Sequence, residues 1–188
     1  MGDRGEAVVH PRLKLEDYIP VKTPKEVFLV LLSDVRNNTE KATKLYQEIG
    51  QHAQDPEIKE ALQARGFASN QVLAKLDECF RLIGEKPVKT TGTLQETFLE
   101  DFRKELGEIQ SPVARHLYIL AKLHHLAHLR MGEYAALTAA ADLAGHHGVG
   151  LLLETCLADK MAFAERTRRL IRRVVDAKLA EKAVGAAP

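Results

Sequence analysis

Tryptophan is absent from this 188-residue sequence, and aromatic residues make up only 5% of it. Uninterrupted apolar runs of about 18 residues, the length that crosses a membrane as a helix, are also missing. No secretion signal is recognisable, so neither export nor a membrane span is expected. The formal net charge of +1 provides no overall attraction to nucleic acid or to an anionic membrane. We therefore expect a cytoplasmic protein that binds neither.

The sequence contains only two cysteines, Cys79 and Cys156, and each lies in an apolar, helical context. Buried free thiols in a reducing cytoplasm explain this pattern better than a disulfide does. A glycine-rich phosphate loop, a serine–histidine–aspartate signature and a cysteine pair at metal-binding spacing are all missing. Apolar residues nowhere alternate with polar ones, so no strand is expected. These absences remove the common enzyme signatures and favour an all-α fold.

The sequence does contain enough apolar residues, 45%, for one domain with a substantial core. We divide it into an irregular N-terminal arm over residues 1–22, a helical domain over 23–180 and a frayed tail over 181–188. The arm contains scattered prolines and glycines with no sustained period. Two interpretations of the arm stay open, a disordered tail and a segment that lies on the bundle or on a neighbouring molecule.

Capping patterns predict where the helices begin. Thr23-Pro24-Lys25-Glu26 is a capping box with proline at the first helical position, and Asp55-Pro56 repeats the cap and the proline. The two helices, over about 24–53 and 56–84, are separated by almost nothing and therefore form an antiparallel hairpin. The polar residues Asn37, Asn38 and Thr39 interrupt the apolar stripe of the first helix, as residues facing water, a partner or a site do.

The second half of the sequence predicts another hairpin. Ser111-Pro112 begins a long apolar helix that ends near Gly145, and a further helix runs from about 149 to 179. A shorter helix over about 94–109 lies in the polar crossover between the two hairpins. Three apolar residues of the long helix lie off its inner stripe, so they need either the short helix or a second subunit to cover them: Ile119, Leu126 and Leu129.

Four stretches resemble the YciF/YciE-like ferritin-like proteins: DPEIKEAL (55–62), LDECFRLIGEKP (76–87), EYAALTAAADLAG (133–145) and LLLETCLADK (151–160). The resemblance extends over about residues 24–175 without large gaps. It implies a ferritin-like four-helix bundle of two antiparallel hairpins with an additional short helix in the crossover. It also implies a link to bacterial stress responses, a dimer, and a carboxylate-rich di-metal centre between the four long helices.

The resemblance also assigns the metal-binding positions of the family to residues of this sequence. They fall on Thr39, beside Glu40, then on Phe67, Ala68 and Val72, then on Ala127 and Arg130, and finally on Glu154, near Asp159. Only Glu154 keeps a carboxylate. Because an inward carboxylate without metal costs several kcal/mol, a chain that loses the metal should lose its acids together. We therefore expect a retained scaffold without a cofactor, in which Arg130 pairs with Glu154.

A rebuilt metal site is the alternative. The long helix carries His116, His124, His125 and His128, and the spacing of His124 and His128 can put two imidazoles on one metal. With Glu40 and Glu154 they would hold iron or manganese, as in a metal-dependent oxidase or a peroxide-handling enzyme. We favour histidines that pack at helix contacts or lie at the surface. Tyr134, on the inner stripe, is expected to be a hydrogen-bonded core residue rather than a redox tyrosine.

A basic run ends the last helix: Arg166, Arg168, Arg169, Arg172 and Arg173. It could bind phosphate or nucleic acid. We favour instead a solvated helix end, where the helix dipole favours cations and neighbouring helices supply acids. Taken together, the sequence predicts a non-catalytic, stress-associated structural or interaction protein, either a homodimer or a larger homo-oligomer, with a metal-dependent enzyme as the alternative.

Overall fold

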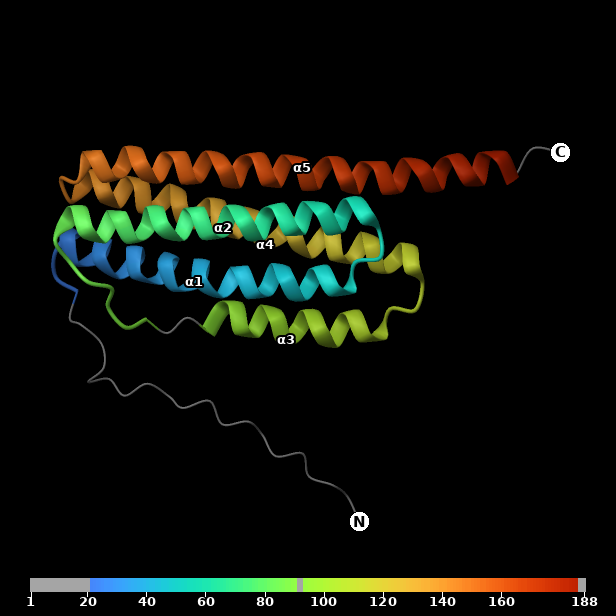
Figure 1. The fold of residues 1–188 in the computed structure, drawn as a ribbon, viewed down its shortest axis with the longest axis horizontal. Helices are drawn as coiled ribbons and strands as arrows, with labels where there is room; N and C mark the ends of the chain where they lie inside the picture. Colours follow the sequence, from blue (N-terminus) through green and yellow to red (C-terminus); the bar gives the residue numbers. More distant parts are fainter. Residues whose placement is uncertain (1–20, 91–92, 186–188) are drawn as a thin grey trace, which may run out of the picture.

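The computed structural model describes residues 21–90 and 93–185, and the predicted arm lies outside them except for residues 21 and 22. Its five helices are α1 (Pro24–His52), α2 (Pro56–Ile83), α3 (Thr93–Glu108), α4 (Pro112–Leu143) and α5 (His147–Gly185). The hairpins α1–α2 and α4–α5 pack into a four-helix bundle, and α3 lies along α1 and α4 (Figure 1). This arrangement confirms the all-α, ferritin-like fold that the sequence predicts.

The caps that mark the helix starts form as expected. The hydroxyl of Thr23 accepts a hydrogen bond from the Glu26 amide, and the Glu26 carboxylate accepts one from the Thr23 amide. The carboxylate of Asp55 accepts hydrogen bonds from the amides of Glu57 and Ile58. Gly84 ends α2 at a φ of 72°, in the left-handed region that a side chain disfavours. Local chemistry therefore sets where the α1–α2 hairpin begins and ends.

The last helix is longer than the sequence indicates. It begins at His147 rather than near residue 149, and it runs through Gly185, so residues 181–185 of the expected frayed tail are helical. Glycines at 148 and 150 resemble a turn in the sequence, but of the glycines around this connection only Gly145 has a positive φ. Gly150 instead lets α5 approach α4, since a Cβ there would lie 3.0 Å from the Asp142 carboxylate. Residues 186–188 lie outside the described range.

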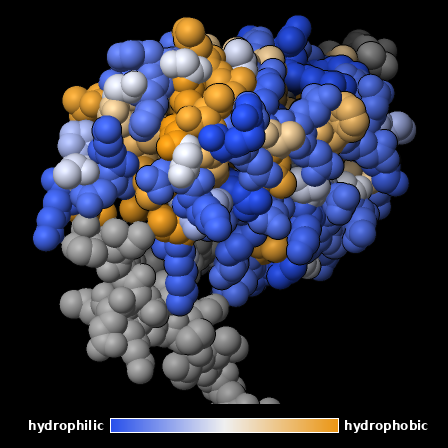
Figure 2. Space-filling model, turned by 60° about the vertical axis from the view of Figure 1, so that its left-hand side comes forward, coloured by the Kyte–Doolittle hydropathy of each residue, from blue (hydrophilic) through white to orange (hydrophobic). Residues whose placement is uncertain are grey.

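The apolar core divides into two clusters, one toward each end of the bundle. The cluster beside α3 contains Phe102 and Leu106 together with Ile119 and Leu126, and Leu129 packs against it, so all three residues that needed a cover have one within the chain. Three large apolar residues of the long helices are exposed rather than buried: Val27, Phe67 and Met161. At the end where α4 joins α5, further exposed leucines make an apolar surface (Figure 2).

Polar residues separate the two apolar clusters on all four long helices. We call this set the central polar layer: Asn38 and Thr39 on α1, Arg65 and Ser69 on α2, Arg130 on α4 and Lys160 on α5. Each of them is buried. Because buried polar groups are costly unless they find partners, the layer is where the interior departs from ordinary bundle packing.

Candidate functional site

Arg130 is the hydrogen-bonding centre of the central polar layer. Its Nη2 donates to Thr39 Oγ1 at 2.8 Å and to the Val35 carbonyl at 3.2 Å, and its Nη1 forms an ion pair with Glu133. The Thr39 hydroxyl in turn donates to the Val35 carbonyl at 2.7 Å and lies 3.3 Å from the hydroxyl of Tyr134. The expected buried, hydrogen-bonded Tyr134 is therefore confirmed. These contacts tie α4 to α1 across the bundle.

Lys160 is 2% exposed, and its Nζ lies 5.1 Å from the centre of the Tyr134 ring. Burial, together with the charges of Arg65 and Arg130, lowers the pKa of Lys160 to about 6. The amine is therefore largely neutral at pH 7. Burial also raises the pKa of Tyr134 to about 12, so its hydroxyl stays protonated.

Arg65 is held by aromatic rings rather than by acids. Its guanidinium carbon lies 4.8 Å from the ring centre of Phe163 and 5.5 Å from that of Tyr46. The Nε of Arg65 is buried and has no hydrogen-bond partner within the described part of the chain. Cation–π contacts of this kind contribute roughly 0.5 to 2 kcal/mol, which is less than the cost of burying the charge.

These residues do not fit a di-metal centre. Two metal ions need several inward carboxylates, whereas the central polar layer contains Arg65, Arg130 and Lys160 and no carboxylate. Glu133 is already paired with Arg130, and burial raises the pKa of Glu133. In residues 21–90 and 93–185, no group of three or more histidine, cysteine, aspartate or glutamate side chains could hold a metal ion. The donor set therefore suits an anion better than a metal cation.

The residues of the alternative metal site do not come together. Glu154 is exposed, so the expected Arg130–Glu154 pair is wrong, and Arg130 pairs with Glu133 one turn along its own helix. Glu40 is exposed and pairs with Arg36 at 3.2 Å. His124 and His128 do lie side by side, with ring centres 4.3 Å apart, and no acid joins them in a ligand set among the described residues.

The positions that the resemblance assigns to metal ligands are buried on some helices and exposed on others. Thr39, Val72, Ala127 and Arg130 are buried as expected. On α2, however, Phe67 is exposed, and the residues that point into the layer are Arg65 and Ser69. On α5 the inward residue is Lys160. The sequence contained a partial signal for these residues, because Lys160 follows the apolar Cys156 by four positions and Arg65 follows the apolar Ala61 by four.

The basic run of α5 is largely paired. Arg166 pairs with Glu60 at 3.6 Å, Arg168 with Glu165 at 2.8 Å, and Arg173 with Glu57. Two of these acids lie on α2, the helix beside α5. This arrangement agrees with the favoured interpretation, a solvated helix end whose cations are balanced by neighbouring acids. The two cysteines are also buried and free, as expected.

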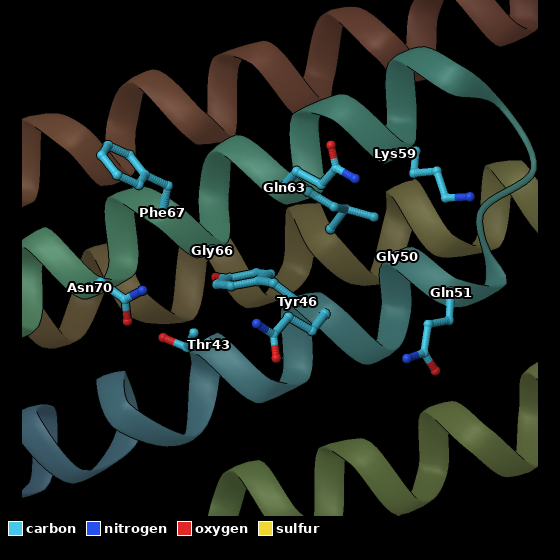
Figure 3. A pocket seen from close by; sticks show the side chains of 11 residues that line it. Thr43, Tyr46, Gly50, Gln51, Lys59, Gln63, Gly66, Phe67 and Asn70 are labelled. Carbon is cyan, nitrogen blue, oxygen red and sulfur yellow. The ribbon is translucent and has the colours of Figure 1, made fainter.

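A groove of about 640 Å³ lies between α1 and α2 (Figure 3). Its lining comes from the second half of α1 and the first half of α2, and it contains one charged residue: Thr43, Tyr46, Gln47, Gly50, Gln51, Lys59, Leu62, Gln63, Gly66, Phe67 and Asn70. The Tyr46 ring lies between the two helices beside Gly66, and Phe67 stands on the α2 rim and points away from the groove. The hydroxyl of Thr43 is buried and has no hydrogen-bond partner in the described part of the structure.

Neither glycine of the groove is required by contacts inside the bundle. A Cβ added at Gly66 would meet nothing within 4 Å, and one at Gly50 would make only ordinary contact with Leu62, at 3.8 Å. A glycine inside a helix destabilises it by about 1 kcal/mol relative to alanine. Packing within the bundle therefore does not explain why glycine stands at these two positions.

Charged side chains recur along the helices. None of the helices that the structure describes has the long apolar stretch that a membrane span requires. Comparison with known proteins identifies one family. The model of the family described as "Domain of unknown function (DUF892)" matches residues 23–180. No curated protein sequence matches the chain.

Several solved structures share the fold. The Escherichia coli stress protein YciF matches with a TM-score of 0.78 at 19% identity, over 83% of this chain and 99% of that one. YcfI of Rhodopseudomonas palustris, for which a structural role has been suggested, matches with a TM-score of 0.75 at 20% identity, over 79% of this chain and 94% of that one. A Xanthomonas campestris protein matches with a TM-score of 0.66 at 17% identity, over 86% and 99% of the two chains. The resemblance to YciF-like proteins is thereby confirmed.

Proposed function

The chain belongs to the DUF892 family, and from that premise we propose that it is a non-catalytic, stress-associated scaffold that assembles with its own copies. The stress association is carried over from YciF, and the structural role from YcfI. The central polar layer supports the non-catalytic part of the proposal. Arg130 is hydrogen-bonded and ion-paired within the bundle, and the described residues contain no cluster of carboxylates that could hold a metal.

The observation that carries the assembly proposal is the α1–α2 face. Phe67, which is 67% exposed, projects beside a recess that is nearly free of charge. Under a two-fold axis a surface meets its own copy, so a projecting ring and a recess on one face can fill one another. Gly66 and Gly50 let a facing helix come close, and the Gln63 and Asn70 amides supply hydrogen bonds.

Light scattering at increasing protein concentration tests this proposal. Replacing Phe67 by serine should raise the dimer dissociation constant at least about tenfold, because an aromatic anchor at an interface contributes 2 kcal/mol or more. The matched control is Leu151→Ser, since Leu151 is also 67% exposed but lies near the start of α5. A monomer at all concentrations, or an equal effect of both substitutions, contradicts assembly through the α1–α2 face.

Metal analysis of the purified protein tests the non-catalytic part separately. The scaffold proposal expects less than stoichiometric iron and manganese, and no turnover of peroxide or oxygen. Two equivalents of either metal per chain would favour the alternative, a metal-dependent oxidase or a peroxide-handling enzyme. The geometry gives that alternative no support, because Glu40 and Glu154 face solvent away from the histidine pair.

A further inference from the structure

The middle of the bundle carries more positive than negative charge. Arg65, Arg130 and Lys160 come from three helices and are 5%, 2% and 2% exposed. Glu133 offsets the charge of Arg130, with which it forms an ion pair. The guanidinium of Arg65 has no such partner, so the layer holds excess positive charge even when the Lys160 amine is neutral. An uncompensated buried charge costs several kcal/mol.

Two donors in this layer lack an acceptor. The Nε of Arg65 makes no hydrogen bond, and Lys160 Nζ makes neither an ion pair nor a hydrogen bond among the described residues. Both groups face aromatic rings instead, Phe163 and Tyr46 for Arg65 and Tyr134 for Lys160. The Nε of Arg65 is fully buried, so bulk water does not take the place of its missing acceptor.

We propose that the central polar layer binds a small monovalent anion of the halide class, held by Arg65 and Lys160 with Arg130 beside them. Such an anion supplies an acceptor to both unsatisfied donors and offsets the excess charge. A compact ion needs the least space in a layer that lies between two apolar clusters. The resemblance implies metal cations between the four long helices, whereas this chain would bind an anion there.

Anion binding is coupled to the protonation of Lys160. Several groups face or adjoin the amine: Arg65 from α2, Arg130, Glu133 and Tyr134 from α4, and Cys156 and Asp159 on α5 itself. Burial and the two arginines hold the pKa of Lys160 near 6, whereas a bound anion favours the charged ammonium. Above this pKa, the protonated form of Lys160, which is the form that binds the anion, becomes ten times rarer with each pH unit. Affinity for the anion should therefore fall about tenfold per unit above pH 6.

Thermal unfolding in sodium chloride and in sodium gluconate, at equal ionic strength, tests the proposal. Gluconate is too large to enter the layer, so chloride should raise the midpoint and gluconate should not. The difference between the two salts should grow with chloride concentration, and it should be larger at pH 6 than at pH 8. Equal midpoints in both salts at pH 6 would overturn the proposal.

Two substitutions of Lys160 sharpen the test. Lys160→Met should abolish the difference between the salts, and Lys160→Arg, which stays charged, should keep that difference at pH 8. The control is Lys75→Met, since Lys75 is a more exposed lysine of α2 that pairs with Asp159 at 3.6 Å. A difference that survives in Lys160→Met, or that disappears equally in the Lys75 control, contradicts a site at Lys160.

Bromide provides a direct readout on the unmodified protein, independent of any variant. In crystals grown in sodium bromide, the anomalous difference map should show a peak between Arg65 and Lys160. Phosphate, tested in the same thermal assay, should have no specific effect, because it is larger and carries more charge. A phosphate effect exceeding that of chloride, or bromide peaks confined to the surface, would overturn the halide assignment.

Discussion

Arg130 on α4 and Thr39 on α1 are joined by a hydrogen bond of 2.8 Å between Nη2 and Oγ1, across the centre of the bundle. The Thr39 hydroxyl is the acceptor, and its own proton is directed to the Val35 carbonyl. One threonine therefore gives a buried guanidinium both an acceptor and a fixed position. The relationship replaces the metal–carboxylate contacts that the resemblance predicts for these two positions.

Replacing Thr39 by valine should lower the free energy of unfolding by about 1 to 3 kcal/mol, because the substitution leaves a buried charged donor short of an acceptor. Urea unfolding measures the change. Thr138→Val is the control, since Thr138 is only half-buried and bonds the Tyr134 carbonyl of its own helix. Equal losses in the two variants would mean that the contact with Arg130 contributes nothing specific.

The stability of the protein should rise with pH above neutrality because of Lys160. Its pKa is about 6 in the folded chain and near the ordinary 10.5 in the unfolded chain, so the unfolded chain binds more protons between these values. One such group raises the free energy of unfolding by about 1.4 kcal/mol per pH unit. Lys160→Met should remove this slope between pH 7 and 8.5 and should stabilise the protein at pH 7. A slope equal to that of the unmodified protein would contradict a neutral buried amine.

Gly66→Ala and Gly132→Ala form a matched pair. Both glycines lie inside helices, and an added Cβ would meet nothing within 4 Å at either position. Each substitution should stabilise the isolated chain by about 1 kcal/mol. Only Gly66→Ala should weaken self-association, because Gly66 lines the α1–α2 groove and Gly132 does not. Thermal unfolding and light scattering of the two variants measure these effects, and equal association would count against the groove as the interface.

The thiols of Cys79 and Cys156 should not react with an aromatic disulfide reagent in the folded protein. Both are buried, and burial raises the pKa of Cys79 to about 12 and that of Cys156 above its ordinary value. Thiolate is the reactive form, so reaction should wait for unfolding. Two thiols per chain should then react in denaturant. Rapid reaction without denaturant would show that the apolar cluster around them opens readily.

Much of the fold could be predicted because the relevant information is local. The capping residues Thr23, Asp55 and Ser111 precede prolines, and in the structure each caps the helix that it was expected to begin. Short connections then made the antiparallel hairpins unavoidable. The apolar stripe of the long helix also placed Tyr134 correctly, and the family resemblance placed Arg130 inside the bundle, where it is buried.

The register on α2 and α5 could not be predicted in the same way. The resemblance placed Phe67 inside, in keeping with its large apolar side chain, whereas the structure exposes Phe67 and buries Arg65 two residues earlier. A shift of two residues turns a side chain by about 200° around a helix. The burial of Lys160 was not predicted either, because lysine is rarely buried without a partner.

The sequence by itself determined the helices, the caps that begin them, the pairing into hairpins and the family. Each of these depends on residues close together in the chain or on the order of whole segments. The tertiary structure decided that Arg65, Arg130 and Lys160 are all buried in one layer and that Arg130 pairs with Glu133 rather than Glu154. It also revealed the groove between α1 and α2. These features depend on the relative rotation and separation of packed helices, and that geometry arises only when all four long helices bury their surfaces together.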